Sequence, residues 1–285
     1  MDKSKNIVVG LDIGGTNMRL GLVKENVLQK IDTIPIFDVN DKKGTLDQLI
    51  GLIEQNFSHN IAAIGMGVPS LVDLKTGVIF DTVNIPSWKV VPLKVILEER
   101  FNVPVYINND ANCFAIGEKY FGHGKDYDNM VGLISGTGTG AGIISNGKLV
   151  SGRNCGAGEF GMVSYLDQNY ENYCSGGTFK QAYGIEAFEA FEKAKQGNTE
   201  AVEIWKTYGQ HFAELIKMIL YTVDPEMIVL GGSLSKAYTF YKNSMLERLG
   251  DFAFKNAVSN LKIEVTSIEN IAVLGAASLY YDALH

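Results

Sequence analysis

Apolar runs of strand length alternate with stretches of helical spacing along this chain of 285 residues. Residues 7–12 form a β-rich apolar run, residues 13–17 are typical of a turn, and residues 18–23 resume an apolar strand, which together predict a β-hairpin. A related strand, turn and strand return at residues 130–144. Two such hairpins, roughly one domain length apart, predict a duplicated architecture.

Between and after the hairpins, several segments place their apolar residues at the spacing of a helix. One helical face carries Leu46, Leu49, Ile50, Ile53 and Phe57. Further helices are predicted at residues 92–101, 111–120, 199–223 and 271–284, and further strands at 61–67, 103–107, 227–230 and 263–266. Strands that alternate with helices predict an α/β fold built in layers.

Composition and charge narrow the classes of function. An apolar share of 46% and a charged share of 20% are typical of a globular protein, and the length corresponds to about two domains. The net charge of −7 makes nucleic acid an unsuitable main partner. No apolar stretch approaches the roughly 18–20 residues that span a bilayer. Three dispersed cysteines without a C-x-x-C pair fit a reducing compartment, so we expect a cytoplasmic protein with no membrane partner.

Glycine gathers in tight turns that follow the predicted strands. The first turn contains Asp12, Gly14, Gly15 and Thr16. Glycines let backbone N–H groups approach a phosphate closely, and the neighbouring carboxylate could hold Mg²⁺ through water. An ordinary hairpin turn would explain the same residues.

A second glycine turn favours phosphate binding over an ordinary hairpin turn. It contains Gly136, Thr137 and Gly138. Two such turns can hold a polyphosphate from both sides, although neither matches a Walker A loop or a Rossmann fingerprint. A third turn, Gly231-Gly232, could let adenine or ribose lie against the backbone, but a plain strand-to-helix turn explains it equally well.

Asp110 lies between a predicted strand and a predicted helix, in the run Asn108-Asn109-Asp110-Ala111-Asn112. Asp is favoured at a helix N-cap, and we expect Asp110 at that position. The carboxyl end of a strand is also where α/β folds bind ligands. Asp110 is therefore a candidate general base, and Asn109 a candidate partner of a sugar hydroxyl.

Four further side chains are candidates for binding a polyhydroxyl ligand. Glu159 and Glu171 lie in glycine-rich surroundings and could accept hydrogen bonds from vicinal hydroxyls, although an ordinary surface glutamate is the simpler interpretation. Asn84 and Trp88 offer an amide and a ring face, although an ordinary proline-bearing loop would explain the same residues.

Taken together and in this order, the motifs resemble those of the ROK sugar kinases, which belong to the actin/hexokinase/Hsp70 ATPase superfamily. They comprise residues 12–16, Asn84 with Trp88, residues 109–112 with Gly117-Glu118, residues 136–140, residues 158–161, and Gly231-Gly232. The resemblance covers nearly the whole chain and implies two ribonuclease-H-like α/β domains with a cleft between them. We expect one domain to comprise residues 1–109 with 271–285, and the other residues 110–270.

The resemblance also implies roles for the residues. ATP with Mg²⁺ and a hexose would bind between the domains, with Asp110 taking the proton of the sugar hydroxyl and Asp12 positioning Mg²⁺ through water. The residues implied to hold phosphates are Gly14, Gly15, Thr16, Gly136, Thr137 and Gly138. Those implied to border adenosine are Gly231 and Gly232, and those implied to hold the sugar are Asn84, Asn109, Asp110, Glu159 and Glu171. A carboxylate of ordinary acidity is ionised at neutral pH, so we expect Asp110 to need no large pKa shift.

The chain departs from the family at the zinc motif. Met162 stands where the family carries a histidine, and the segment from Gly161 to Glu171 is too short for the family's Cys-x-Cys-Gly-x-x-Gly-Cys loop. Cys155 and Cys174 stand alone. We therefore expect no zinc. The residues expected to anchor this segment instead are Tyr165, Tyr170 and Tyr173.

The resemblance favours a glucokinase-like enzyme that phosphorylates the 6-hydroxyl of glucose. Alternatives are a kinase for N-acetylmannosamine, fructose, allose or a β-glucoside, or a catalytically weak sugar-binding or regulatory protein of the same family. Only six residues precede the first predicted strand, too few for a helix-turn-helix, so we expect no DNA binding. An actin-like or chaperone-type ATPase would turn over ATP without sugar. A homodimer is left open.

Overall fold

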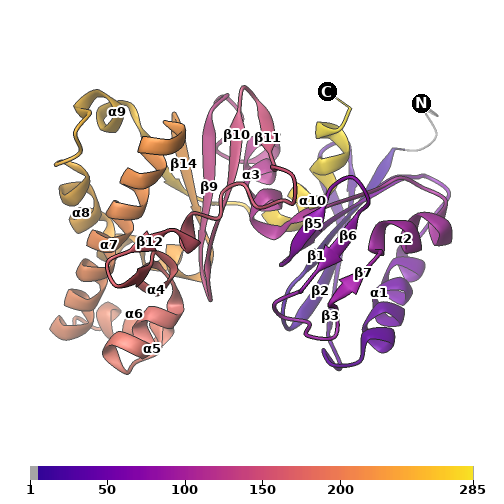
Figure 1. The fold of residues 1–285 in the computed structure, drawn as a ribbon, viewed down its shortest axis with the longest axis horizontal. Coiled ribbons are helices and arrows are strands. Elements are labelled where there is room, and N and C mark those ends of the chain that lie inside the picture. Colours follow the sequence, from indigo (N-terminus) through magenta and orange to yellow (C-terminus); the bar gives the residue numbers. More distant parts are fainter. Residues whose placement is uncertain (1–5, 285) are drawn as a thin grey trace.

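The computed structural model describes residues 6–284 and contains two five-stranded sheets with the same strand order (Figure 1). The first sheet runs, in spatial order, through β3 (Val27–Pro35), β2 (Asn17–Lys24), β1 (Ile7–Ile13), β4 (Ile61–Val68) and β8 (Val105–Asn109). The second runs through β11 (Lys148–Val150), β10 (Thr139–Ser145), β9 (Met130–Ser135), β14 (Met227–Gly231) and β15 (Lys262–Val265).

The strand directions repeat as well as the order. In each sheet the first three strands along the chain form an antiparallel meander, and the last two join it in parallel. The duplicated architecture expected from the two hairpins is confirmed.

Helices cover both sheets and supply much of their cores. In the first half these are α1 (Lys42–Asn56) and α2 (Leu93–Phe101), and in the second half α7 (Thr199–Val223) and α8 (Tyr238–Leu249). All four bury apolar side chains in the core of their own half. No helix among residues 6–284 is both long enough and apolar enough to cross a membrane.

Two helices lie between the halves (Figure 1). Helix α3 (Asp110–Phe121) follows the first sheet but packs against β9 and β10, whereas α10 (Ile271–Asp282) follows the second sheet but packs against β1 and β4. Glycine permits this closeness, because a Cβ on Gly65 would lie 1.8 Å from the carbonyl oxygen of Ala276. Since α3 contacts strands of both sheets and α10 packs against α3, the expected domain boundaries at residues 110 and 271 stay a prediction.

Several elements escaped the sequence patterns. Strand β3 lies at the edge of its sheet and is largely exposed, so it has no apolar run to reveal it. The remaining elements are β5 (Leu71–Asp73), β6 (Val78–Phe80), β7 (Val90–Val91), β12 (Ser164–Tyr165), β13 (Gln168–Asn169), α4 (Glu171–Cys174), α5 (Gly176–Tyr183), α6 (Ala187–Lys195) and α9 (Lys255–Asn260), with short 3₁₀ turns at Phe160–Met162 and Ser233–Ala237.

Candidate active site

Strand register brings two aspartates to the same edge of the first sheet. Asp12 in β1 is aligned with Gly67 in β4, and Gly67 is aligned with Asn108 near the end of β8. A Cβ on Gly67 would lie 3.6 Å from the Cα of Asp110, so the glycine leaves room for the start of α3. Asp12 and Asp110 therefore lie at the ends of two parallel strands that are separated only by β4.

The sequence led us to expect Asp110 at the N-cap of α3, but Asp110 is the first residue of the helix. The N-cap is Asn109, whose Oδ1 accepts the backbone N–H of Ala111 at 2.9 Å. Asp110 Oδ1 accepts the same N–H at 2.9 Å. The amide of Asn109 thus takes over capping and leaves the Asp110 carboxylate at the end of the sheet.

The acidity of Asp110 differs from the ordinary value that we expected. Burial raises the pKa of Asp110 to about 6, and the negative charges of Asp12 and Glu159 add to the rise. Asp110 is still mainly ionised at pH 7, but it is a stronger base than a solvated carboxylate. This combination suits a group that must accept a proton near neutral pH.

Asp12 forms an ion pair with Arg19 on the adjacent strand, with Nη1 and Oδ2 3.2 Å apart. Burial raises the pKa of Asp12, and Arg19 opposes this rise. Two acidic groups on one side of the sheet, with Asp12 able to accept hydrogen bonds from metal-bound waters, suit Mg²⁺ held through water. Arg19 was not among the candidates, although counting outward from the hairpin turn would have placed it opposite Asp12.

The first glycine turn lies against Asn84. A Cβ on Gly15 would lie 2.9 Å from the Cβ of Asn84, while Gly14 donates its N–H to the Asn17 carbonyl at 3.0 Å. Thr16 is exposed at the tip of the turn. Trp88 is different: its side chain is fully buried in the first core, so its ring offers no face to a ligand and this expectation was wrong.

The second and third glycine turns lie side by side. A Cβ on Gly136 would lie 3.7 Å from the Ser233 hydroxyl oxygen. Gly232 has a φ of 84°, and a Cβ there would lie 2.2 Å from the carbonyl oxygen of Ser135. Gly231 is buried against the Phe114 ring, whereas Gly232 is exposed. The exposed tip of the second turn is formed by Thr137, beside Gly138.

Glu171 reaches the second turn from the start of α4. Its Oε2 accepts the backbone N–H of Thr139 at 2.8 Å and would lie 2.6 Å from a Cβ on Gly138. Gly161 packs on the other side of Thr139, where a Cβ would lie 2.4 Å from the carbonyl oxygen. Burial and the nearby charge of Glu171 raise the pKa of Glu159. Glu171 therefore lies on the second turn, and Glu159 is near enough to feel its charge.

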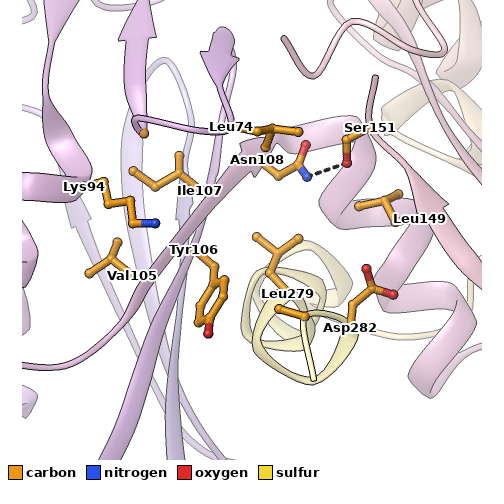
Figure 2. Close-up of a pocket in the computed structure, with 12 residues that line it drawn as sticks. Leu74, Lys94, Val105, Tyr106, Ile107, Asn108, Leu149, Ser151, Leu279 and Asp282 are labelled. Atoms are coloured by element: carbon orange, nitrogen blue, oxygen red, sulfur yellow. Dashed lines mark hydrogen bonds between the residues drawn. The ribbon is translucent and has the colours of Figure 1, made fainter. Parts of the chain in front are cut away.

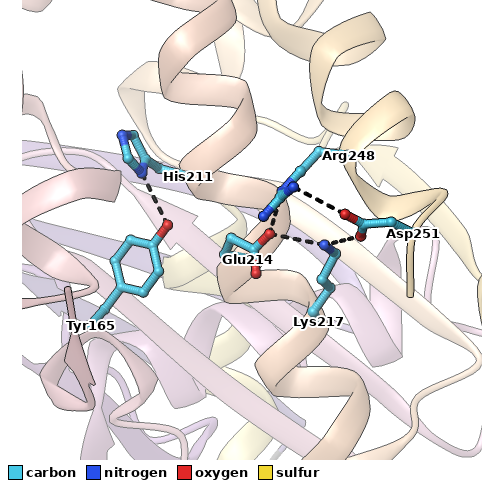
Figure 3. A network of polar contacts seen from close by, with 6 residues as sticks. All are labelled: Tyr165, His211, Glu214, Lys217, Arg248 and Asp251. Carbon is cyan, nitrogen blue, oxygen red and sulfur yellow. Dashed lines mark hydrogen bonds and ion pairs between the residues drawn. The ribbon is translucent and has the colours of Figure 1, made fainter. Parts of the chain in front are cut away.

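The segment before Glu171 is held by aromatic contacts. Tyr165 stacks on Tyr170 with ring centroids 4.4 Å apart and meets Tyr173 edge-on at 5.2 Å. The Tyr165 hydroxyl also makes a 3.1 Å hydrogen bond with Nδ1 of His211, close to an ion-pair network around Glu214 on α7 (Figure 3). The anchoring role expected of these tyrosines matches these contacts.

Cys155 and Cys174 are both buried, and Met162 is 57% exposed. Among residues 6–284, no group of three or more His, Cys, Asp or Glu side chains is placed to hold a metal ion by itself. A Mg²⁺ ion at Asp12 would thus need water and ligand oxygens to complete its coordination, as is common for this ion. The expected absence of zinc stays a prediction.

Comparison with known proteins places these features in context. The sequence profile of the ROK family matches residues 8–283. The glucokinase of Thermotoga maritima is 28% identical, and the alignment covers 95% of this chain and 96% of that protein. The N-acetyl-D-glucosamine kinase of Vibrio parahaemolyticus is 30% identical over 95% of this chain and 98% of that protein. The solved structure of a ROK family glucokinase from Streptomyces griseus, in complex with glucose and AMPPNP, is 25% identical with a TM-score of 0.80, covering 96% of this chain and 98% of that one.

Proposed function

Because this chain belongs to the ROK family, we propose that it is an ATP-dependent sugar kinase that phosphorylates the 6-hydroxyl of glucose. The observation that carries the proposal is the position of Asp110. It is a partly buried carboxylate at the end of a parallel strand, on the same side of the sheet as Asp12 and its glycine turn, with a pKa of about 6. A base of this kind can accept a hydroxyl proton at neutral pH.

In this mechanism, bound ATP with Mg²⁺ supplies the phosphoryl group. Asp110 accepts the proton of the attacking sugar hydroxyl, and Asp12 holds the cation through water. The phosphates are held by Gly14, Gly15, Thr16, Gly136, Thr137 and Gly138, while Gly231 and Gly232 border adenosine. Positioning and charge stabilisation dominate phosphoryl transfer, and such turns provide both through their N–H groups.

The sugar hydroxyls are assigned to four side chains that lie near the first two glycine turns and the start of α3. They are Asn84, Asn109, Glu159 and Glu171. Support comes from three positions: Asn84 lies against the first turn, Asn109 caps the helix of the base, and Glu171 bonds to the second turn, with Glu159 near enough to feel its charge. Carboxylates and amides at these places can accept and donate hydrogen bonds to vicinal hydroxyls.

N-acetylglucosamine is a second candidate acceptor. The kinase from Vibrio parahaemolyticus that bears this sugar in its name is as similar to the chain as the glucokinase of Thermotoga maritima. Met162 is exposed three residues after Glu159, at the position where the family carries a polar histidine. Because this replacement changes the side chain near the proposed sugar site, both sugars need to be tested as acceptors. A non-catalytic sugar-binding protein remains the alternative from another class.

The deciding experiment is a coupled ATPase assay over a panel of sugars. We expect ATP turnover to require a sugar, with glucose or N-acetylglucosamine giving the highest kcat/KM. Asp110→Asn should bind both ligands but lose about 10²–10⁴-fold in kcat. Asp47→Asn, which removes an exposed carboxylate paired with Lys43, is the matched control and should keep full activity.

Two outcomes would contradict the proposal. Sugar binding without turnover would favour the non-catalytic alternative, and ATP turnover that does not depend on sugar would favour an actin-like or chaperone-type ATPase. If Asp110→Asn kept more than a tenth of the wild-type kcat, Asp110 would not be the general base.

A further inference from the structure

Two asparagines next to Asp110 have no part in the proposed chemistry. Asn108 is 4% exposed and Asn112 is fully buried. Buried amides are nearly always hydrogen-bonded, and their partners show what they hold in place.

Asn108 ties the junction between β8 and α3 to the other half of the protein. Its Oδ1 accepts the backbone N–H of Asn109 at 2.9 Å and the Nδ2 of Asn112 at 2.8 Å. Its own Nδ2 donates to the hydroxyl of Ser151 at 2.9 Å (Figure 2). Since β8 belongs to the first sheet and Ser151 directly follows β11 of the second, this bond joins the two halves two residues before Asp110.

Asn112 ties the same junction to a second point of the loop after β11. Its Nδ2 donates to the carbonyl oxygen of Cys155 at 3.3 Å. Cys155 has a φ of 61°, a backbone conformation that residues other than glycine seldom adopt. The loop is closed by the N–H of Ala157, which donates to the Ser151 carbonyl at 3.3 Å, and it leads directly to Glu159.

Packing does not enclose this junction on every side. A cavity of about 170 Å³ lies beside the Asn108–Ser151 bond, between β8, the end of β11 and the last turn of α10 (Figure 2). Its walls include Tyr106, Leu149 and Leu279. Close packing normally fixes the geometry of an interior, so next to a cavity this task falls more heavily on the hydrogen bonds.

One atom of Asn112 also indicates that this residue serves to hold the junction in place. Its buried Oδ1 has no hydrogen-bond partner within the described part of the chain. An unpaired buried acceptor destabilises a fold, so an amide here is a poor choice for stability alone. What the amide contributes is the pair of bonds from its Nδ2, to Asn108 and to Cys155.

We propose that Ser151, Asn108 and Asn112 form a clamp that positions Asp110 relative to the loop bearing Glu159. They are positioning residues, because they act through the backbone of Asn109 and the loop and need not touch the substrate. A misplacement of about 1 Å at a reacting group can cost on the order of 10²-fold in rate. The inference rests on the proposed function, in which Asp110 is the base.

Ser151→Ala is the main test, because Ser151 is only partly buried and its loss should leave the fold intact. We expect kcat to fall about 10- to 100-fold while the KM values for sugar and ATP change by less than about threefold. Ser151→Thr keeps a hydroxyl and should restore most of kcat. The matched control is Ser244→Ala, which removes a hydroxyl that donates to the Lys206 carbonyl at 2.9 Å, on α8 and away from the site.

The pH profile separates positioning from a loss of folded protein. A loosened Asp110 would be better hydrated, so the acid limb of kcat/KM should move to lower pH in Ser151→Ala. The charged groups that act on Asp110 are Asp12 and Glu159, and Ser151→Ala removes neither. A looser loop would weaken the repulsion from Glu159, which moves the acid limb in the same direction.

Three results would overturn the clamp: an unchanged kcat in Ser151→Ala, a loss of kcat without movement of the acid limb, or a loss matched by a smaller folded fraction in thermal unfolding. A wild-type protein that is inactive with every sugar would overturn the proposed function instead. The two failures are therefore distinguishable.

Discussion

The carboxylate of Glu171 and the backbone N–H of Thr139 are joined by a 2.8 Å hydrogen bond that places a negative charge on the second glycine turn. In the proposed function, this turn holds phosphate and Glu171 holds a sugar hydroxyl. One side chain would thus affect both ligands, and any coupling between the two binding events must be reciprocal.

Replacement of this carboxylate should therefore change nucleotide binding as well as sugar binding. Glu171→Gln keeps an oxygen that can accept the Thr139 N–H but removes the charge. We expect its affinity for a non-hydrolysable ATP analogue, measured by calorimetry without sugar, to rise roughly tenfold, or about 1.4 kcal/mol. Glu186→Gln, on an exposed pair with Lys180, is the control. Equal nucleotide affinities in wild type and Glu171→Gln would contradict the prediction.

The raised pKa of Asp110 predicts the pH dependence of catalysis. A base must be deprotonated to act, so kcat/KM of the wild type should fall as the pH drops through about 6. The measurement is a pH–rate profile between about pH 3.5 and 8 with sugar below its KM. An acid limb near pH 4 is typical of a solvated carboxylate, and it would show that the group whose deprotonation controls the rate does not have the raised pKa of Asp110.

The same pKa predicts that Asp110 lowers the stability of the fold. Its pKa is about 6 in the folded protein against 3.8 as the ordinary value, so the folded state binds more protons between these two pH values. The contribution of Asp110 to the free energy of unfolding therefore falls as the pH rises through this window. The full destabilisation is present above about pH 6.

Asp110→Asn should consequently raise the free energy of unfolding by about 2–3 kcal/mol at pH 8, and by less at pH 5. Urea unfolding at the two pH values measures the difference. A variant less stable than wild type at pH 8 would mean that the negative charge at the helix start outweighs its burial.

The absence of a zinc motif predicts a protein that works without zinc. A structural zinc site needs about four nitrogen or sulfur ligands, and Cys155 and Cys174 are buried in different cores. Elemental analysis of the purified protein should find no stoichiometric zinc. After prolonged chelation, the return of Mg²⁺ alone should restore activity. Activity that returns only with zinc would show that ligands outside this segment complete a site.

Local patterns in the sequence determined the two hairpins, the long helix α7 and the strand before each glycine turn, because hydrophobic spacing and turn chemistry act over a few residues. They also placed Asp110 at a strand end. Strand β3 and helices α4 to α6 were missed, since their exposed or short stretches carry little periodic signal.

Only the tertiary structure decided what surrounds each side chain. It buried Trp88, raised the pKa of Asp110 through burial and Asp12, and set Glu171 on Thr139, a residue 32 positions away. Burial and electrostatic interaction depend on which distant segments meet. The spacing of residues along one segment carries no information about that meeting, so the chemistry of this site emerges only when the two sheets and their connecting helices pack together.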